Sequence, residues 1–288
     1  MAVRKRKIGG LTDEQAVSLR VLVATPKFEL IPLKNAAEKI EELPHAAAIT
    51  VTASPSHGIE ATLDLATTAA ERGHSVIPHL SAHMIRDRAH LGEVLARCRE
   101  AGLRQVFVVG GDAKDKGEFH DGLMLLRAID EAGHPFTEIG VPSYPEGHHD
   151  IADERLLEVL LEKQKLASYM ATQMCFNPGA IVSWIARMRA AGVTLAVHLG
   201  TPGVAELTKL MAISARIGIA DSARYLSKNR KMVGSLLTPG KFGPDALLLG
   251  MADAFCDPAA RVEALHLFTF NQVAATLEWQ RRMLAELG

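Results

Sequence analysis

The fold is decided between residues 47 and 79, where AAITVT (47–52), IEATLDLATTAAER (59–72) and SVIPH (75–79) follow one another. The first and third pieces are short and rich in β-branched residues, which is typical of buried strands in a parallel sheet. The middle piece has apolar residues at helical spacing and is followed by Gly73, which can close a helix in the left-handed conformation. The stretch therefore predicts a strand, a helix and a second, parallel strand.

The same unit recurs along almost the whole chain, and further helices end at Gly102, Gly133 and Gly192. The predicted strands are Arg20–Thr25 (with Glu29 as its outer limit), Ala47–Thr52, Ser75–His79, Gln105–Gly110, Glu138–Val141, Ser168–Gln173, Thr194–His198 and Ala264–Thr269. The predicted helices are Asn35–Glu42, Ile59–Arg72, Ile85–Ala101, Leu123–Ala132, Asp153–Lys165, Ile181–Ala191, Val204–Arg216 and Gln272–Leu287.

Eight strands alternating with helices predict an α/β fold, a (β/α)8 TIM barrel, because closure removes both sheet edges. An open Rossmann sheet is the alternative, and it is disfavoured because no GxGxxG motif follows the first strand. We expect one catalytic domain over residues 1–288, with residues 1–18 as an N-terminal tail. The long segment Ile217–Pro258 predicts extra helices between strands 7 and 8 (Asp221–Arg230 and Asp245–Asp253) that cover one end of the barrel.

Composition excludes several classes of protein. The chain is 48% hydrophobic and 23% charged with a formal net charge of −1, so we expect no nucleic-acid, membrane or obligate protein partner. No apolar run suggests a secretion signal or a membrane span. The three cysteines are far apart and predict neither disulfides nor a thiolate zinc site, and we expect a cytoplasmic location.

Polar residues gather at the predicted carboxyl ends of the strands, where such barrels carry their active sites. They are Glu29, Thr52, His79, Asp112, Tyr144, His148, Gln173, His198, Asn271 and Gln272. Several have ordinary alternatives: Glu29 as a solvated acid, and Gly110-Gly111-Asp112 as a tight turn with Asp112 capping the next helix, or as a phosphate loop. The histidine spacings match no strong metal motif, so we predict no metal.

Taken together, these side chains suit hydrogen-bond recognition of a polar heterocycle with one proton transfer. They also resemble, in order, the motifs of the methylenetetrahydrofolate reductase family. The matching segments are Phe28-Glu29-Leu30-Ile31-Pro32, Val51-Thr52, Pro78-His79-Leu80, Gly110-Gly111-Asp112, Tyr144-Pro145-Glu146-Gly147-His148, Thr172-Gln173 and Thr269-Phe270-Asn271.

The resemblance implies an oxidoreductase of one-carbon metabolism and methionine biosynthesis that reduces 5,10-methylenetetrahydrofolate to 5-methyltetrahydrofolate. It implies Glu29 as the catalytic acid that protonates N10 of the folate. The residues implied for binding the reduced folate are Asp112 (two bonds to the pterin), Gln173, Tyr144, Asn271 and Gln272. The residues implied for binding the cofactor are Thr52, His79, Gly110, Gly111, Tyr144, His148 and Lys163.

The chain departs from the family where most members hold FAD. Gly110 replaces an arginine, Phe119–Gly122 replaces Tyr-Ala-Ser-Asp, and apolar or acidic residues around Leu156–Glu162 replace the Asp, Asn and Arg of the fifth helix, with Lys163 near the end of that pattern. The family's aromatic of the seventh loop falls near Val204–Ala205, and Gln272 replaces an arginine.

This pattern resembles the divergent flavin-independent, mycobacterial-type branch, which implies direct hydride transfer from NADH or NADPH without FAD. Two alternatives stay open: a reductase that binds FAD by other contacts, and a folate-binding or methyl-carrier barrel without redox chemistry.

Overall fold

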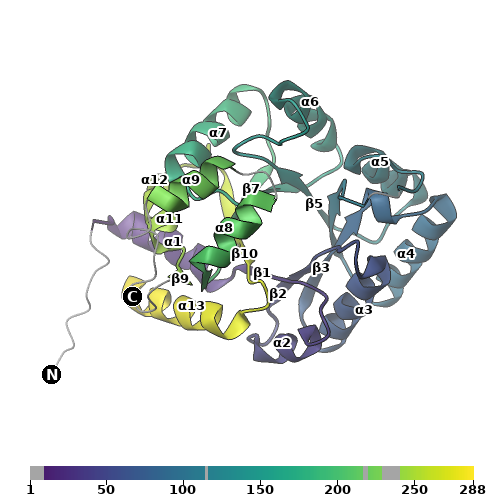
Figure 1. Cartoon of the computed structure of the whole chain (residues 1–288), viewed down its shortest axis with the longest axis horizontal. Coiled ribbons are helices and arrows are strands. Elements are labelled where there is room, and N and C mark those ends of the chain that lie inside the picture. The colour runs from purple at the N-terminus through teal and green to yellow at the C-terminus, as the bar shows by residue number, and fades with distance from the viewer. Residues whose placement is uncertain (1–9, 114–115, 217–219, 229–240) are drawn as a thin grey trace.

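A closed barrel of parallel strands forms the centre of the molecule (Figure 1). The computed structural model describes residues 10–113, 116–216, 220–228 and 241–288. The strand order around the barrel is β1-β10-β7-β6-β5-β4-β3-β2, which confirms the predicted (β/α)8 fold. The strands are β1 (Lys27–Leu30), β2 (Ala48–Val51), β3 (Ser75–Ser81), β4 (Gln105–Val109), β5 (Glu138–Ser143), β6 (Tyr169–Thr172), β7 (Ala196–Pro202) and β10 (Val262–Phe268).

Helices surround this barrel and pack their apolar faces on the outward side chains of the strands. The helices that follow strands are α2 (Ala36–Glu42), α3 (Gly58–Glu71), α4 (Arg88–Glu100), α5 (Gly122–Ala132), α6 (Asp153–Lys163), α7 (Pro178–Ala190), α8 (Leu207–Arg216) and α13 (Val273–Leu287), with a short 3-10 turn, η1 (Ala82–Met84). All four glycines predicted to end helices have positive φ, as expected. None of the helices in the described ranges is long and apolar enough to cross a membrane.

The predicted first strand was wrong. Residues 20–24 belong to a helix, α1 (Asp13–Ala24), and β1 begins only at Lys27. Thr12 and Gln15 form a capping box, in which each side chain accepts a hydrogen bond from the other residue's backbone N–H. This cap and the burial of Leu19, Leu22 and Val23 at helical spacing outweigh the β-branched composition. The predicted tail is therefore wrong from Asp13 onward.

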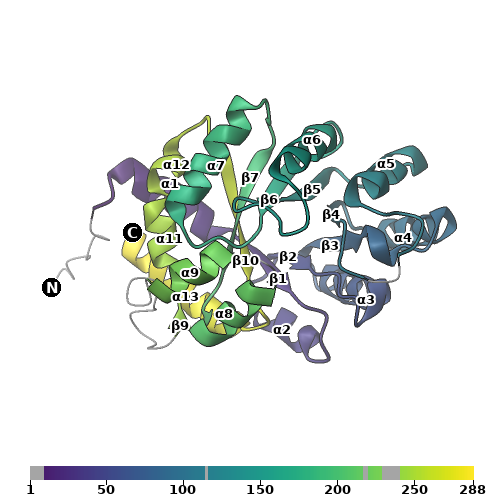
Figure 2. The same ribbon diagram turned by 45° about the horizontal axis from the view of Figure 1, so that its top comes forward.

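The segment between β7 and β10 supplies part of the predicted cover. Strand β8 (Ala205–Glu206) pairs antiparallel with β9 (Lys241–Phe242), so the helix predicted from Val204 starts only at Leu207. An apolar cluster joins α8, α9 (Ala220–Lys228) and β9 to residues at the carboxyl ends of β6 and β10. It includes Leu226 of α9, Phe176 from the segment after β6, and Phe268 at the end of β10. Figures 1 and 2 show α8 and α9 on the β10–α13 side of the barrel.

The second predicted extra helix is two short helices, α11 (Asp245–Gly250) and α12 (Ala252–Cys256). They lie in the outer layer, where α11 contacts α7 and α12 contacts α1, rather than over the end of the barrel. Asp245 anchors α11 by accepting hydrogen bonds from Trp279 and Arg282 of α13. Residues 229 and 230 of the first predicted extra helix lie outside the described residues.

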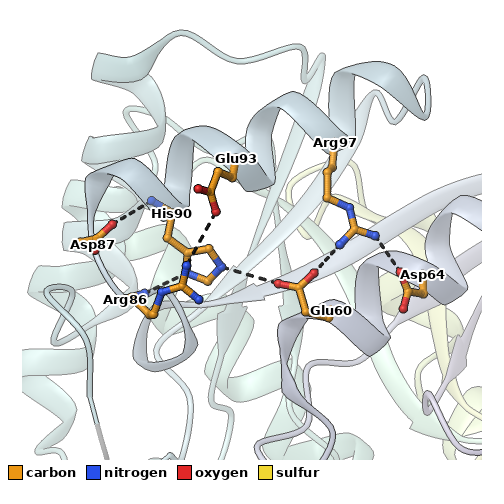
Figure 3. Close-up of polar contacts among 7 residues, drawn as sticks. All are labelled: Glu60, Asp64, Arg86, Asp87, His90, Glu93 and Arg97. Atoms are coloured by element: carbon orange, nitrogen blue, oxygen red, sulfur yellow. Dashed lines mark hydrogen bonds and ion pairs between the residues drawn. The ribbon is translucent and has the colours of Figure 1, made fainter.

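A polar network joins α3 to α4 on the outside of the barrel (Figure 3). Arg97 of α4 contacts Glu60 and donates to Asp64 of α3 at 2.7 Å. His90 lies 3.7 Å from Glu60, and its Nδ1 accepts a hydrogen bond of 3.1 Å from the Arg86 backbone. We call Glu60, Asp64, His90 and Arg97 the outer network. It ties together two helices that flank β3 and leaves the barrel interior untouched.

Side chains fill the barrel interior toward the amino-terminal ends of the strands. Tyr169, at the start of β6, stacks on His198 of β7 with ring centroids 3.8 Å apart. The Lys27 ammonium lies 4.2 Å from the centre of the Tyr169 ring. Gly140 leaves room for this ring, because a Cβ there would lie 2.3 Å from it. The packed layer closes the amino-terminal end of the barrel and leaves the other end for a site.

Candidate functional site

The predicted acid, Glu29, lies inside the barrel in contact with two histidines. Its neighbours Phe28 and Leu30 are buried against the helices, so Glu29 faces inward from β1. A hydrogen bond of 2.8 Å joins Glu29 Oε2 to Nε2 of His266 in β10. Nε2 of His79, from β3, lies 3.9 Å from the same oxygen. We call Glu29, His79 and His266 the inner cluster.

The inner cluster is largely buried, and no lysine or arginine among the described residues forms an ion pair with its carboxyl. The side chains of Glu29, His79 and His266 are 14%, 9% and 2% exposed. Burial lowers the pKa of His79 to about 4, although the Glu29 charge acts in the opposite direction. His79 is therefore neutral at neutral pH, and its buried Nε2 has no hydrogen-bond partner among the described residues. The arrangement can hold one carboxyl group in a fixed position and exchange a proton with a ligand above it.

His266 was not among the predicted site residues. The available signal was the alternation in β10, where Leu265 and Leu267 pack outward on the helices and His266 falls on the inward face. Because β10 pairs directly with β1, an inward side chain at this level meets those of β1.

The glycine loop after β4 brings β3 and β4 close together. The Gly110 carbonyl accepts hydrogen bonds from the Ser81 hydroxyl (3.2 Å) and the His83 backbone (3.0 Å). Gly111 has φ of 98°, and a Cβ there would lie 1.9 Å from Ser81 Oγ. The loop thus requires glycine for its own packing.

Asp112 does not cap the next helix. The N-cap of α5 is Asp121, whose side chain accepts from the Leu123 and Met124 backbones. Asp112 is exposed and acts electrostatically on Tyr144 and His148 instead. Burial, and then the Asp112 charge, raise the pKa of Tyr144 to about 12. The structure therefore brings together three of the predicted site residues: Asp112 from the loop after β4, and Tyr144 and His148 from the loop after β5.

Two predicted binding amides already have protein partners. The Asn271 side chain accepts from the Ile31 N–H and donates to the Ile31 carbonyl, both at 2.9 Å. It thereby ties the β10 loop to the β1 loop beside Glu29. Gln173 Oε1 accepts from the Met174 backbone at 2.9 Å, which orients its amide.

Thr52 and Gln272 lie at the ends of their strands. The Thr52 backbone donates to Leu30, and its carbonyl accepts from the Thr62 hydroxyl. The Gln272 carbonyl accepts from the Thr276 hydroxyl in α13. These contacts involve backbone atoms, so the predicted binding roles of the two side chains stay predictions.

A cavity of about 310 Å³ lies between α6, α7 and the β5 loop. Its lining includes Tyr144, Glu146, Asp153, Lys163, Trp184 and Arg187. Burial lowers the pKa of Lys163 to about 8, with the Asp121 charge opposing the shift. Two predicted cofactor residues, Tyr144 and Lys163, therefore share one cavity, and His148 packs edge-on against the Tyr144 ring.

In the described part of the chain, two groups of side chains have a geometry that could hold a metal ion. In each group, the potential ligand atoms all lie within 4.8 Å of one another. One group is the inner cluster, and the other is the consecutive set His148, His149 and Asp150. No metal was predicted from the sequence, because the meeting of three ligand-type atoms from β1, β3 and β10 depends on the closure of the barrel.

Comparison with known proteins identifies the family. The family model described as methylenetetrahydrofolate reductase matches residues 8–220. Methylenetetrahydrofolate reductase 1 of Schizosaccharomyces pombe is 31% identical over 136 residues, which is 44% of this chain and 22% of that protein. Methylenetetrahydrofolate reductase 2 of the same yeast is 28% identical over 130 residues, 38% of this chain and 20% of that protein. The matched part thus spans about a fifth of these relatives.

Among solved structures, a Clostridium thermocellum protein described as binding two copies of 5-methyl-5,6,7,8-tetrahydrofolic acid superposes with a TM-score of 0.65. The match covers 91% of this chain and 94% of that one at 12% identity, so it supports the fold. The family model, in contrast, covers well over half of the 288 residues. The chain therefore belongs to the methylenetetrahydrofolate reductase family.

Proposed function

We propose that the chain reduces 5,10-methylenetetrahydrofolate to 5-methyltetrahydrofolate with NADH or NADPH as hydride donor and without FAD. One folate, one reduced nicotinamide and one proton give the methyl product and the oxidised nicotinamide. The observation that carries the proposal is the buried Glu29 carboxyl, held by His266 at the carboxyl end of β1 in a barrel of this family.

Glu29 is proposed to protonate N10 as the five-membered ring of the folate opens. The resulting iminium cation at N5 then accepts hydride on its exocyclic carbon. The 2.8 Å bond to His266 fixes the carboxyl, and neutral His79 adds no competing charge. A positioned acid of this kind contributes about 10²–10⁴-fold to a rate.

Asp112, Gln173 and Tyr144 are proposed to bind the pterin, with Asn271 and Gln272 at the β10 end of the site. A carboxylate such as Asp112 can accept two N–H bonds from the pterin. In support, Asp112 lies near enough to Tyr144 to affect its pKa.

The nicotinamide nucleotide is proposed to lie over Thr52, His79, Gly110 and Gly111 and to reach His148, Tyr144 and Lys163. The cavity beside Tyr144 supports this placement of the nucleotide, because its apolar walls and polar groups suit a nucleoside. Three carboxylates line it, from Glu146, Asp153 and Glu154. Carboxylates suit ribose hydroxyls, and Lys163 and Arg187 in the same lining suit phosphate oxygens, so the proposal keeps both NADH and NADPH as hydride donors.

The test is a visible spectrum of the purified protein, followed by an assay of NADH absorbance with 5,10-methylenetetrahydrofolate in flavin-free buffer. We expect a colourless protein that oxidises NADH only when the folate is present. A yellow protein, or one that needs added FAD, would favour the FAD-dependent alternative. Folate binding without NADH oxidation under either condition would favour a non-redox carrier.

A further inference from the structure

We propose that the inner cluster, Glu29, His79 and His266, is a binding site for a divalent transition metal, with Zn²⁺ as the probe. Two imidazoles and one carboxylate are a common ligand set for zinc. The three residues come from β3, β1 and β10, so the rigid barrel holds their backbones in place. One potential ligand atom of each residue lies within 4.8 Å of the other two.

The two separations that involve the Glu29 carboxyl need only small side-chain adjustments. Tetrahedral zinc with bonds of about 2.0–2.2 Å separates neighbouring ligand atoms by about 3.3–3.5 Å. The separations here are 2.8 Å between Glu29 Oε2 and His266 Nε2, and 3.9 Å between Glu29 Oε2 and His79 Nε2. One is too short and the other too long by similar amounts, so a shift of the Glu29 carboxyl away from His266 and toward His79 improves both.

The chemistry of the cluster also suits a metal. Nε2 of His79 is buried without a hydrogen-bond partner in the described part of the chain, and a cation would supply the missing partner. The carboxylate balances half of the charge of a divalent ion. Glu29 keeps 14% of its side-chain surface exposed, which leaves access for an ion and a water molecule as fourth ligand.

The consecutive group, His148, His149 and Asp150, is the weaker site. His149 Nε2 is already paired with Asp150 at 2.8 Å, and His148 Nδ1 accepts from the Asp150 backbone. The side chains of His149 and Asp150 are 52% and 73% exposed, so water competes for an ion there. This group therefore serves as an internal control for binding to surface histidines.

Zinc binding at the inner cluster should be moderate in affinity. Nδ1 of His266 is buried without a partner in the described residues, whereas most zinc-bound imidazoles have a second hydrogen bond that fixes the ring. The lack of such a partner costs about 10–100-fold in affinity. Binding does not depend on the proposed function. One consequence does rest on that function: a bound ion occupies the carboxyl oxygen that carries the proton, so zinc inhibits the reductase.

The experiment is a zinc titration of chelator-treated, dialysed protein in competition with a chromophoric zinc indicator. We expect one Zn²⁺ per chain. The single variants His79→Gln, His266→Gln and the isosteric Glu29→Gln should each weaken binding at least tenfold, while the double variant His148→Gln/His149→Gln keeps it. Thermal unfolding of each variant verifies that it is folded, and visible absorption of Co²⁺-loaded protein reports tetrahedral coordination directly.

Loss of binding in the surface double variant, with binding retained in the inner variants, would overturn the proposal, and so would the absence of stoichiometric binding to the folded protein. Zinc inhibition of NADH oxidation is measured separately. A protein that binds zinc through the inner cluster yet reduces no folate would refute the reductase proposal and leave the metal site standing.

Discussion

The inner cluster and the outer network each contain a carboxylate beside a histidine, in different surroundings. In the outer network, Arg97 bridges Glu60 and Asp64, whose side chains are 59% and 72% exposed. In the inner cluster, the carboxyl of Glu29 is 14% exposed, and its only ion-pair partners among the described residues are histidines. Buried histidines occur in both regions, His90 outside and His79 and His266 inside.

The difference lies in charge balance. An exposed carboxylate paired with arginine stays hydrated, so the ion pair has a small desolvation penalty and adds little to the free energy of unfolding. A buried carboxyl without a permanent cation is costly unless hydrogen bonds or a ligand compensate it. The comparison teaches that the carboxyl groups worth testing for function in this barrel are those that are largely buried without a lysine or arginine partner among the described residues.

The largest expected effect is on catalysis. Glu29→Gln removes the proposed proton donor and should lower kcat by about 10²–10⁴-fold. The matched change in the outer network, Glu60→Gln, should leave kcat within about twofold, since it touches only α3 and α4. Steady-state assays of both variants in flavin-free buffer measure the contrast. Equal activities would show that burial and pairing do not distinguish the two carboxyls.

The next effect is on stability at the barrel mouth. Gly111→Ala places a Cβ 1.9 Å from Ser81 Oγ at a positive φ, so Ser81 must turn away and lose its hydrogen bond to Gly110, and the change should cost roughly 2–3 kcal/mol of unfolding free energy. Gly102 follows the carboxyl-terminal end of α4 and also has a positive φ, but a Cβ there meets no atom within 4 Å. Gly102→Ala should therefore cost about 1 kcal/mol of unfolding free energy. Urea denaturation gives both values. A Gly111 variant as stable as the Gly102 variant would contradict the close approach of β3 and β4.

A third effect is the response of the barrel interior to acid. Burial lowers the pKa of His198 well below 6.5, with the Lys27 charge acting in the same direction. Below pH 6.5 the unfolded chain binds a proton at this residue that the folded chain does not, so stability falls as the pH is lowered. The contribution approaches a tenfold change in the unfolding constant per pH unit.

His198→Gln should remove this contribution, whereas His149→Gln, on an exposed loop, should not. Urea midpoints measured at several pH values between 7 and 5 check the contrast. An unchanged pH dependence in His198→Gln would mean that this histidine is protonated in the folded barrel.

The smallest effect is expected in the outer network. Arg97→Ala removes both ion pairs to α3 and should cost no more than about 1 kcal/mol, with activity unchanged. Thermal unfolding and the reductase assay measure the two quantities. A loss of activity would show that the spacing of α3 and α4 controls the loops at the mouth of the barrel.

Periodic features made most of the fold predictable. Strands β2 to β6 end within two residues of the predicted ones, because alternation of strands, amphipathic helices and closing glycines is local information. Strand β7 runs to Pro202, four residues past its predicted end, so His198 lies within the strand and not at its carboxyl end. The error at residues 20–25 arose because a capping box and tertiary packing outweighed β-branched composition.

Prediction of the site residues was limited for the same reason, because it too depends on tertiary contacts. Glu29 and His79 could be found at strand ends, and the structure brings them together. His266 could not be singled out, since its role depends on which strand lies beside β1, and that is settled by barrel closure. Likewise, the partners of Asn271 on Ile31 are 240 residues away in the chain. Contacts between distant segments leave no periodic trace in a single sequence.

The central claim is that reduced nicotinamide delivers hydride directly to the folate above Glu29. It is tested most directly with NADH dideuterated at C4 of the nicotinamide, in flavin-free ordinary water, with mass analysis of the 5-methyltetrahydrofolate formed. Direct transfer predicts one deuterium in the methyl group of every product molecule. Product without deuterium would show that the hydride passes through an exchangeable carrier such as a flavin, and would contradict the account.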